Sequence, residues 1–281
     1  MAGFTPTEMK KILDWESKEV VNVFDEVTLW SAPFGRMLLE NIPMMPRANI
    51  VDIGFGTGFP LIELSQRFGD KAKIYGIDIW KEGINRAKEK IKTLEITNIE
   101  ILEESATKIN IGDQQIDLVT SNLGVNNFEQ KEAVYQEIHR ILKSNGRLSI
   151  TTNPVGTFEE LFEVFRSIFK ALNLKEEQTN LAKSIGHRST EGGIISALKQ
   201  HGFTCIKTQS DSTKMRFVDA EALLNHSLIR IGFRKYWEEM ISEEHSAHFF
   251  EQLILKINQL IESNGEFTLT IPMLYLEFEK T

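Results

Sequence analysis

The sequence predicts an α/β fold in which strands alternate with helices around a glycine-rich turn. Residues 49–53 are a short β-branched run of the kind that forms a buried strand. Three glycines follow within residues 54–58, and the apolar side chains of residues 61–68 then recur at the spacing of one helix face. A second strand is expected over residues 73–77 and is followed by Asp78. This order of strand, turn, helix and strand is the basis of the fold prediction.

The glycine-rich turn suits a nucleotide-like cofactor that carries an amino acid end. Its three glycines can adopt positive φ and let a ligand approach the backbone, while the amides that begin the next helix offer positive potential to a carboxylate. Asp52 precedes the first glycine by two residues and can attract an ammonium group. Asp78 can accept hydrogen bonds from both hydroxyls of a ribose. Phe59 stands where a dinucleotide-binding turn needs glycine, which disfavours nicotinamide and flavin cofactors.

These residues carry a resemblance to a known family. The run Val51–Gly58 resembles motif I of class I S-adenosylmethionine-dependent methyltransferases, and Tyr75–Ile79 resembles the family's second motif. The resemblance covers residues 48–155. It implies a Rossmann-like methyltransferase fold, a doubly wound, mostly parallel seven-stranded sheet with the cofactor S-adenosyl-L-methionine across the carboxyl ends of the first strands. The cofactor-binding residues expected from it are Asp52, Gly54, Phe55, Gly56, Thr57, Gly58, Asp78, Ile79, Ser105, Ala106 and Asn122.

The next strands fit the same resemblance, with one departure. Residues 99–102 look like the third strand, and Ser105 stands where many members have an aspartate that takes the adenine amino group. A serine hydroxyl can accept that hydrogen bond, but it is shorter and uncharged. The adenine contact is therefore expected either at Ser105 or at a backbone carbonyl. Residues 116–122 look like the fourth strand, with Asn122 reaching the cofactor at its end.

The residues after the fourth strand argue against one class of substrate. Methyltransferases that act on exocyclic amines of nucleic acid bases carry an Asn/Asp-Pro-Pro-aromatic motif at this place, whereas this chain has Asn-Leu-Gly-Val at residues 122–125. A helix is then expected over residues 131–142, ended by residues 144–146. A fifth strand is expected over residues 147–152.

Residues 1–47 are expected to form an N-terminal helical cap. A capping box at residues 5–8 starts a helix whose apolar side chains continue at mainly helical spacing to Val27. The segment from Trp30 to Phe34 breaks this pattern before a second short helix. The side chains of Trp30 and Phe34 either wall the site, as N-terminal helices do in related enzymes, or pack against the sheet edge.

A second segment after the fifth strand is a candidate for enclosing the substrate. Residues 157–174 place their aromatic side chains on one helix face, which is typical of a core helix. The polar residues 183–191 follow, and they contain the pair His187 and Arg188 between glycines. This pair either meets a substrate or is a surface pair with no role.

A third segment interrupts the last two strands, which are expected over residues 203–209 and 267–280. Its apolar residues fill one helix over residues 222–237 and another over residues 249–260. These helices either cap the substrate opening or form the interface of a homodimer. The expected domains are an N-terminal cap at 1–47, an S-adenosylmethionine-binding α/β domain at 48–210 and 265–281, and a helical insertion at 211–264.

Composition restricts the partners and the location. The formal net charge is −8 and no Lys/Arg cluster is present, which argues against nucleic acid, whose affinity depends on phosphate neutralisation. No apolar run is long enough to span a bilayer and no secretory leader is visible, so a cytoplasmic location is expected. His245 and His248 could share a helix face, but without further ligands nearby no metal site is expected.

The predicted activity is methyl transfer to a small or medium-sized, partly hydrophobic metabolite. Because the sulfonium methyl is already activated, positioning of the acceptor and exclusion of water can do much of the work. If the acceptor needs a base, His187 and His226 are the candidates, and Asn126 and Arg188 could position a substrate. Two alternatives stay open, namely a non-catalytic cofactor-binding regulatory protein and a nicotinamide-dependent oxidoreductase.

Overall fold

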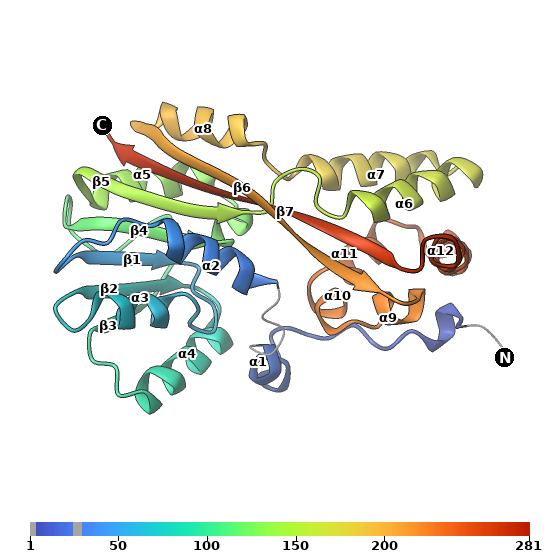
Figure 1. The fold of residues 1–281 in the computed structure, drawn as a ribbon, viewed down its shortest axis with the longest axis horizontal. Helices are drawn as coiled ribbons and strands as arrows, with labels where there is room; N and C mark the ends of the chain where they lie inside the picture. Colours follow the sequence, from blue (N-terminus) through green and yellow to red (C-terminus); the bar gives the residue numbers. More distant parts are fainter. Residues whose placement is uncertain (1–3, 25–29) are drawn as a thin grey trace. The chain divides into compact units, whose positions relative to one another are not determined.

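A computed structural model describes residues 4–24 and 30–281 and contains one seven-stranded sheet (Figure 1). The strand order is β3-β2-β1-β4-β5-β7-β6. The strands are β1 (Asn49–Ile53), β2 (Lys73–Asp78), β3 (Ile99–Glu103), β4 (Ile116–Asn122), β5 (Leu142–Thr152), β6 (Phe203–Phe217) and β7 (Phe267–Lys280). Strands β1 to β5 pair in parallel, and β7 runs antiparallel to β5. The predicted doubly wound, mostly parallel sheet is confirmed.

The chain divides into two compact units. The first, here called the sheet unit, comprises residues 16–154, 190–211 and 273–281. The second, here called the helical unit, comprises residues 155–189 and 212–272 together with the described residues before 16. Strands β6 and β7 each pass from one unit into the other.

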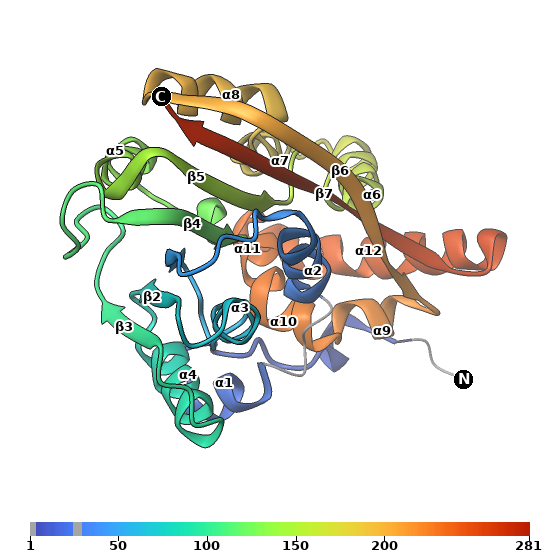
Figure 2. The same cartoon turned by 60° about the vertical axis from the view of Figure 1, so that its left-hand side comes forward.

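Helices cover both faces of the sheet in the sheet unit. In Figure 2, α2 and α3 lie on one side of the strands, and α5 and α8 lie on the other. The helices of this unit are α1 (Lys18–Phe24), α2 (Ser31–Asn41), α3 (Leu61–Phe68), α4 (Lys81–Thr93), the short η3 (Gly124–Asn127), α5 (Lys131–Ile141) and α8 (Glu191–Gln200). Because both faces are covered, the central strands are buried almost throughout, as parallel strands require.

Each face of the central strands has a different character. One set of side chains, which includes Val51, Val119 and Ile150, joins α5 and α8 in an apolar core. Neighbouring residues point to the opposite face because side chains alternate along a strand. On that face several buried side chains are polar, among them Asp52 and Thr120. The polar set lies at the part of the sheet where the glycine-rich turn begins.

The helical unit has its own aromatic core. Its helices are η1 (Pro6–Glu8), α6 (Glu159–Ala171), α7 (Lys175–Gly186), α9 (Ala220–Leu224), α10 (Ser227–Gly232), α11 (Arg234–Glu239) and α12 (Glu243–Asn264). The ring of Phe165 meets that of Phe249 at a centroid distance of 4.9 Å, and Phe158 meets Phe233 at 4.9 Å. The predicted aromatic face at residues 157–174 is therefore a core face, buried within this unit.

The predicted continuous N-terminal helix is wrong over the described residues. The capping box is present, with Thr5 N donating to Glu8 Oε2 at 2.7 Å, but the 3-10 helix ends at Glu8. The following residues run without helix to Lys18, and Val27 lies outside the described residues. In the helical unit the N–H of Lys10 donates to Asn225 Oδ1 at 2.8 Å. A helix would pair this backbone N–H group with a carbonyl of the same segment, whereas here it is bonded to a residue far along the chain.

Other boundaries also differ from the prediction. The expected single helix at 222–237 is three short helices, because Asp219 and His226 act as N-caps of α9 and α10. The expected break at Trp30–Phe34 is instead the start of α2, whose first turn tolerates Pro33. Most of the expected polar segment at 183–191 belongs to the ends of α7 and α8.

Candidate functional site

The glycine-rich turn connects β1 to α3 and has the backbone that only glycine adopts freely. Gly54, Gly56 and Gly58 have φ values of 77°, 55° and 112°. A Cβ on Gly54 would lie 3.1 Å from the Cα of Gly124, which belongs to the segment after β4. The turn therefore packs against a second backbone segment and leaves no room for side chains at this position.

Asp78 ties the turn to the end of β2. Its Oδ2 accepts from Gly56 N at 2.7 Å, and its Oδ1 accepts from the amides of Ile79 and Trp80 at 2.7 and 2.8 Å. A carboxylate has about four acceptor positions. These three hydrogen bonds fix the orientation of the Asp78 carboxylate, and its remaining acceptor positions lie mainly on Oδ2.

Asp52 is a fully buried carboxyl group at the carboxyl end of β1. Thr120 Oγ1 donates to its Oδ1 at 2.7 Å, while its Oδ2 is buried and has no hydrogen-bond partner among residues 4–24 and 30–281. Burial raises the pKa of Asp52 to about 7, the hydrogen bond from Thr120 lowers it, and the charge of Asp78 raises it. A buried oxygen without a donor is unfavourable, so this atom can readily accept from a cationic ligand.

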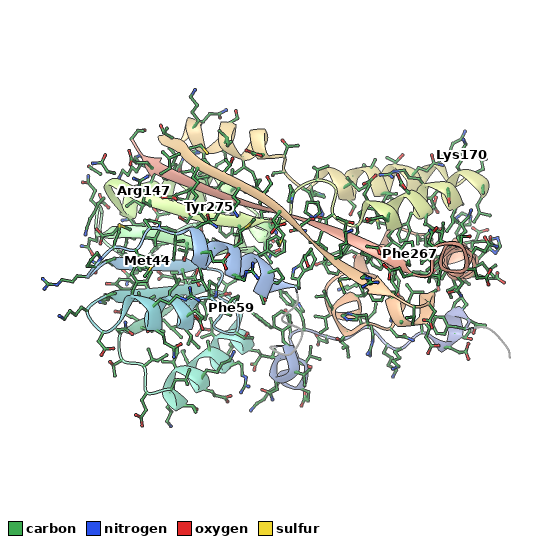
Figure 3. All side chains as sticks on the ribbon, viewed as in Figure 1. Met44, Phe59, Arg147, Lys170, Phe267 and Tyr275 are labelled. Carbon is green, nitrogen blue, oxygen red and sulfur yellow. The ribbon has the colours of Figure 1, made fainter. Side chains whose placement is uncertain are left out.

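Two phenylalanines of the turn pack inward. Phe55 is 1% exposed, and a Cβ on Gly76 would lie 2.9 Å from its ring. Phe59, labelled in Figure 3, lies against α2, where a Cβ on Gly35 would be 2.1 Å from its Cε1. Phe55 was expected at the cofactor, and its side chain instead anchors the turn. A Cβ at position 35 would overlap the ring of Phe59, and a Cβ at position 76 would meet Leu61 Cδ2 at 2.6 Å as well as the ring of Phe55.

The end of β4 lies beside the turn. Leu123 has a φ of 65°, which is unusual for a residue other than glycine. Asn122 is 7% exposed, donates to Ser31 O at 3.2 Å and accepts from Thr151 Oγ1 at 2.7 Å. Asn122 therefore joins β4 to β5 and to the start of α2, and these bonds determine where its amide lies.

Asn126 lies at the same edge of the sheet. Its Nδ2 donates to Asn153 Oδ1 at 2.6 Å, and its Oδ1 accepts from the hydroxyl of Thr152. The residue is exposed, although both ends of its amide are held. The two asparagines and Thr152 form an ordered polar group where β4 and β5 end.

Two other expected cofactor residues lie near the end of β2 and β3. Ile79 is 73% exposed and follows Asp78, so an apolar side chain is available beside the carboxylate of Asp78. Ser105 is exposed, and its Oγ lies 2.9 Å from Thr107 Oγ1. Ala106 packs partly against the apolar core, and Thr57 is 5% exposed.

The aromatic residues expected at the substrate differ in exposure. Phe34 is 0% exposed on the inner face of α2, whereas Trp30 is half-buried just before that helix. Their rings are 6.0 Å apart. The position of Phe34 within the core agrees with packing on the sheet, and Trp30 keeps an accessible part.

Three candidates belong to the helical unit. His187 is exposed at the end of α7, and Arg188 is half-buried. His226 lies between α9 and α10, where its Nδ1 accepts from Leu228 N at 3.3 Å. Burial lowers the pKa of His226. That hydrogen bond occupies the Nδ1 lone pair and leaves Nε2 to carry the proton of the neutral ring.

Sequence reasoning missed four residues that shape the site. Thr120 donates a hydrogen bond to Asp52. The absence of a side chain at Gly124 leaves space for Gly54, and its absence at Gly35 leaves space for the ring of Phe59. Trp80 packs on the ring of Phe24 in α1 at a centroid distance of 5.5 Å, and a Cβ on Gly56 would lie 3.7 Å from it. The glycines at 35 and 124 were visible in the sequence, but only the fold identifies which rings and backbones they meet.

The described residues offer no grouping of three His, Cys, Asp or Glu side chains that could hold a metal ion. His245 Nδ1 lies 2.9 Å from Glu177 Oε1, and His248 Nδ1 lies 3.3 Å from Glu251 Oε2. Nor is any described helix both long and apolar enough to cross a membrane.

A surface cavity of about 530 Å³ lies away from the glycine-rich turn. It is lined by the starts of β2 and β3, including Lys73, Asn98 and Glu100. Ligands of open α/β sheets bind at the opposite, carboxyl ends of the strands. The cavity is therefore separate from the candidate site formed by Asp52, the turn and Asp78.

Sequence comparisons identify methyltransferases as relatives. A family model described as "Methyltransferase domain" matches residues 46–221. The chain is 22% identical over 189 residues to the arsenite methyltransferase of Halobacterium salinarum, covering 66% of this chain and 46% of that protein. It is 26% identical over 206 residues to the demethylmenaquinone methyltransferase of Lactococcus lactis, covering 70% of this chain and 80% of that one. The chain thus spans less than half of the first of these relatives.

Solved structures share the fold. A SAM-dependent methyltransferase from Aquifex aeolicus matches with a TM-score of 0.53 and 20% identity over 68% of this chain and 91% of that one. The phosphoethanolamine N-methyltransferase 2 of Haemonchus contortus matches with a TM-score of 0.52 and 16% identity over 88% of this chain and 52% of that one. Together with the family model, which covers more than half of the chain, these matches show that this chain belongs to the methyltransferase domain family and has the fold of class I S-adenosylmethionine-dependent methyltransferases.

Proposed function

We propose that this chain transfers a methyl group from S-adenosylmethionine to a small or medium-sized, partly hydrophobic metabolite. The observation that carries the proposal is the buried Oδ2 of Asp52, which no described residue hydrogen-bonds, two residues before a turn of three glycines with positive φ. This carboxyl oxygen lies next to a glycine backbone that a ligand can approach closely.

The residues present fit the cofactor's parts. Asp52 would attract the ammonium group, the amides of the turn and of the start of α3 would face the carboxylate, and the free capacity of Asp78 would accept from the ribose. Ile79 would cover one side of the adenine. The bound cofactor supplies an activated methyl group, and the chain's own residues bind and orient it.

Positioning is the main task left to the chain. Asn126 presents an amide held by Thr152 and Asn153 at the edge where β4 and β5 end, so an acceptor there would meet a preorganised polar group. A net charge of −8 disfavours nucleic acid as acceptor. The relatives named for demethylmenaquinone support an apolar ring compound as the acceptor class.

Calorimetry tests the cofactor part of the proposal. Titration with S-adenosylmethionine, S-adenosylhomocysteine and NAD should give binding of the two sulfur compounds at micromolar concentration and none of NAD. The variant Asp52→Asn should weaken S-adenosylmethionine binding, whereas Asp70→Asn at an exposed position should leave it unchanged. Absence of binding by both sulfur compounds would refute the proposal.

The acceptor part is tested by product formation. The chain is incubated with S-adenosylmethionine and separate panels of quinols, phenols, amines and thiols, and S-adenosylhomocysteine is measured by mass spectrometry. Turnover should occur with ring compounds and not with DNA or RNA oligonucleotides. Turnover confined to oligonucleotides would exclude the small-molecule acceptor. The cytoplasmic location, the homodimer and the three-domain division remain predictions from the sequence.

A further inference from the structure

We propose that β6 is a dimer interface, at which two copies of this chain pair their β6 strands antiparallel to one another. The contact uses residues 206–212 in the middle of the strand, with Gln209 of one copy opposite Gln209 of the other. This inference goes beyond the proposed function and does not depend on it. It also differs from the sequence-based expectation, which considered the helices at 222–237 and 249–260 for a homodimer.

β6 is an edge strand of the sheet. Among the described residues its one neighbouring strand is β7, and β3 forms the opposite edge. Along the outer side of an edge strand, backbone N–H and C=O groups point away from the sheet and can pair with another strand. β6 is 15 residues long, and within it the carbonyl of Lys207 accepts from Cys205 Sγ at 3.8 Å. The outer side of β6 can therefore receive a further strand.

The middle of β6 is exposed on both faces of the sheet. Every residue from 206 to 212 is exposed, although successive side chains of a strand point to opposite faces. Cys205 and Thr213, which flank this run, are both half-buried. The exposed run is thus centred on Gln209, so a partner strand centred there meets the most accessible part of β6.

The charges on β6 are complementary in this register. When two copies of one strand pair antiparallel about a two-fold axis, residues at equal distances before and after the central residue lie opposite one another on the same face. With Gln209 at the centre, Lys207 of each copy lies opposite Asp211 of the other. The dimer contains this pair twice. Opposite charges directly across two strands stabilise the pairing, and like charges destabilise it.

Neighbouring registers lack this complementarity. A centre at Thr208 or at Ser210 places both charged residues opposite neutral ones. A centre at Lys207 or at Asp211 places like charges opposite one another. Charge and exposure therefore favour the same centre, Gln209.

The other edge strand does not have such a pattern. β3 is five residues long, and its charged residues are both acidic, Glu100 and Glu103. These two carboxylates already lie 3.0 Å from Lys73 Nζ and 3.9 Å from Lys88 Nζ. Self-pairing of β3 would bring no opposite charges together, so the association is assigned to β6.

Analytical ultracentrifugation over a range of concentrations tests the charge pairing. The contact is much shorter than that of a stable dimer, so wild type should form a weak dimer with a micromolar to millimolar Kd. Lys207→Asp and Asp211→Lys should each raise the Kd at least about tenfold, because both symmetric pairs then repel. The double variant Lys207→Asp/Asp211→Lys should dimerise like wild type. Lys71→Asp, which is exposed and outside β6, changes the net charge as Lys207→Asp does and should leave the Kd unchanged.

Disulfide formation tests the register. In a Cys205→Ser background, Gln209→Cys provides a single thiol whose counterpart lies directly opposite, at a Cα separation of about 4.5–5.5 Å that a disulfide can span. Thr204→Cys in the same background is the control, because its counterpart lies about 34 Å further along the paired strand. After oxidation, Gln209→Cys should run as a covalent dimer and Thr204→Cys as a monomer.

Thermal unfolding separates loss of the dimer from loss of the fold. Both single charge variants should unfold close to the wild-type temperature, since Lys207 and Asp211 are exposed and the Lys207 Nζ lies 5.7 Å from the centroid of the Tyr275 ring, a weak contact. An unchanged Kd in Lys207→Asp, or a folded double variant that stays monomeric, would overturn the proposal. So would equal crosslinking of Gln209→Cys and Thr204→Cys, or a wild type that stays monomeric up to about 1 mM.

Discussion

Asp52 is the residue through which pH acts most directly on the candidate site. Its folded pKa is about 7, raised from 3.8 mainly by burial. The folded chain therefore holds a proton that the unfolded chain loses between about pH 4 and 7. The stability contributed by protonated Asp52 is complete below pH 4 and is lost as the pH rises through 7. Above that pH the site contains a buried carboxylate ready for a cation.

Cofactor affinity should consequently depend on the ionisation of Asp52. Between pH 7 and 5.5 the affinity for S-adenosylmethionine should fall by about tenfold per pH unit once Asp52 is protonated, because only the carboxylate pairs with the ammonium group. Isothermal titration in buffers of different ionisation enthalpy should also detect proton release on binding near pH 7. In Asp52→Asn the affinity should be low and nearly constant over this range. A steep pH dependence retained in Asp52→Asn would place the titrating group elsewhere.

The same substitution should affect stability in the opposite direction. At pH 8 the cofactor-free Asp52→Asn variant should be more stable than wild type by about 1–4 kcal/mol, since a buried charge becomes a neutral amide that can still accept from Thr120. At pH 4, where Asp52 is protonated, the difference should disappear. Urea denaturation at the two pH values measures it, and equal stabilities at pH 8 would contradict burial of an ionised Asp52.

Gly35 tests the packing beneath the turn. Gly35→Ala should destabilise the chain by about 1–3 kcal/mol and weaken cofactor binding, because the new methyl group would overlap the ring of Phe59 next to the glycine-rich turn. Gly186→Ala is the matched control, since it lies in α7 with no atom within 4 Å of the added Cβ. Thermal unfolding and calorimetry report the two effects. A Gly35→Ala variant that matches Gly186→Ala in both would disprove the contact.

At the level of elements, hydrogen bonds to later residues of the helical unit fix the conformation of the N-terminal segment. Arg234 is 3% exposed, its Nε lies 3.0 Å from Glu238 Oε1, and its guanidinium donates to the carbonyls of Lys10 and Leu224. Arg234→Ala should therefore cost about 3–5 kcal/mol, because Glu238 and two carbonyls lose their partner. Lys235→Ala, at the next position of α11 and largely exposed, should change stability by less than about 0.5 kcal/mol.

Limited proteolysis adds a local readout to that comparison. Cleavage near Lys10 and Lys11 by trypsin should become faster in Arg234→Ala than in Lys235→Ala, since the bonds that hold this segment are lost. Equal cleavage rates in the two variants, with equal stability, would show that Arg234 does not hold the N-terminal segment.

The elements that the sequence could predict are those determined by local pattern. The strands from 49 to 122 and helices α3, α5 and α6 follow from apolar periodicity and turn residues, and the structure confirms them. The N-terminal segment could not be predicted in this way, because its hydrogen bonds come from Asn225 and Arg230, more than 200 residues away along the chain. Likewise, His226 lies in an apolar run, and its role as an N-cap is visible only in the fold.

The candidate site shows the same division between local and long-range causes. The glycines, Asp52 and Asp78 could be proposed as cofactor residues because they lie within 27 residues of one another in the sequence. Thr120 approaches Asp52 only through the pairing of β1 with β4, a register in which the two residues are direct partners. The inward orientation of the Phe55 side chain was not visible in the sequence, because its ring packs where Gly76 in β2 has no side chain. Sequence pattern thus identifies the glycine-rich turn but not the residues that pack against it.

On the scale of the whole molecule, β6 and β7 connect the two units. Each is longer than the parallel strands β1 to β4 and contributes residues to both units, and β7 carries the buried Tyr275 that donates to Ser149 and Glu277 in the sheet unit (Figure 3). Five chain crossings, at residues 15, 154, 189, 211 and 272, join the units. Continuous strands and several crossings favour unfolding of the two units as one cooperative system.

Hydrogen exchange in the presence of ligand tests this cooperativity. At a concentration of S-adenosylhomocysteine about 100 times its Kd, binding should stabilise the folded chain by about 2.7 kcal/mol. If the units unfold together, the slowest amides of β1 and β4 and those of α12, in the helical unit, should be slowed by the same factor of about 100. Mass spectrometry of proteolytic fragments measures both sets in one sample. Protection confined to the sheet unit would show that the helical unit opens independently, because a ligand stabilises only the unfolding events that release it.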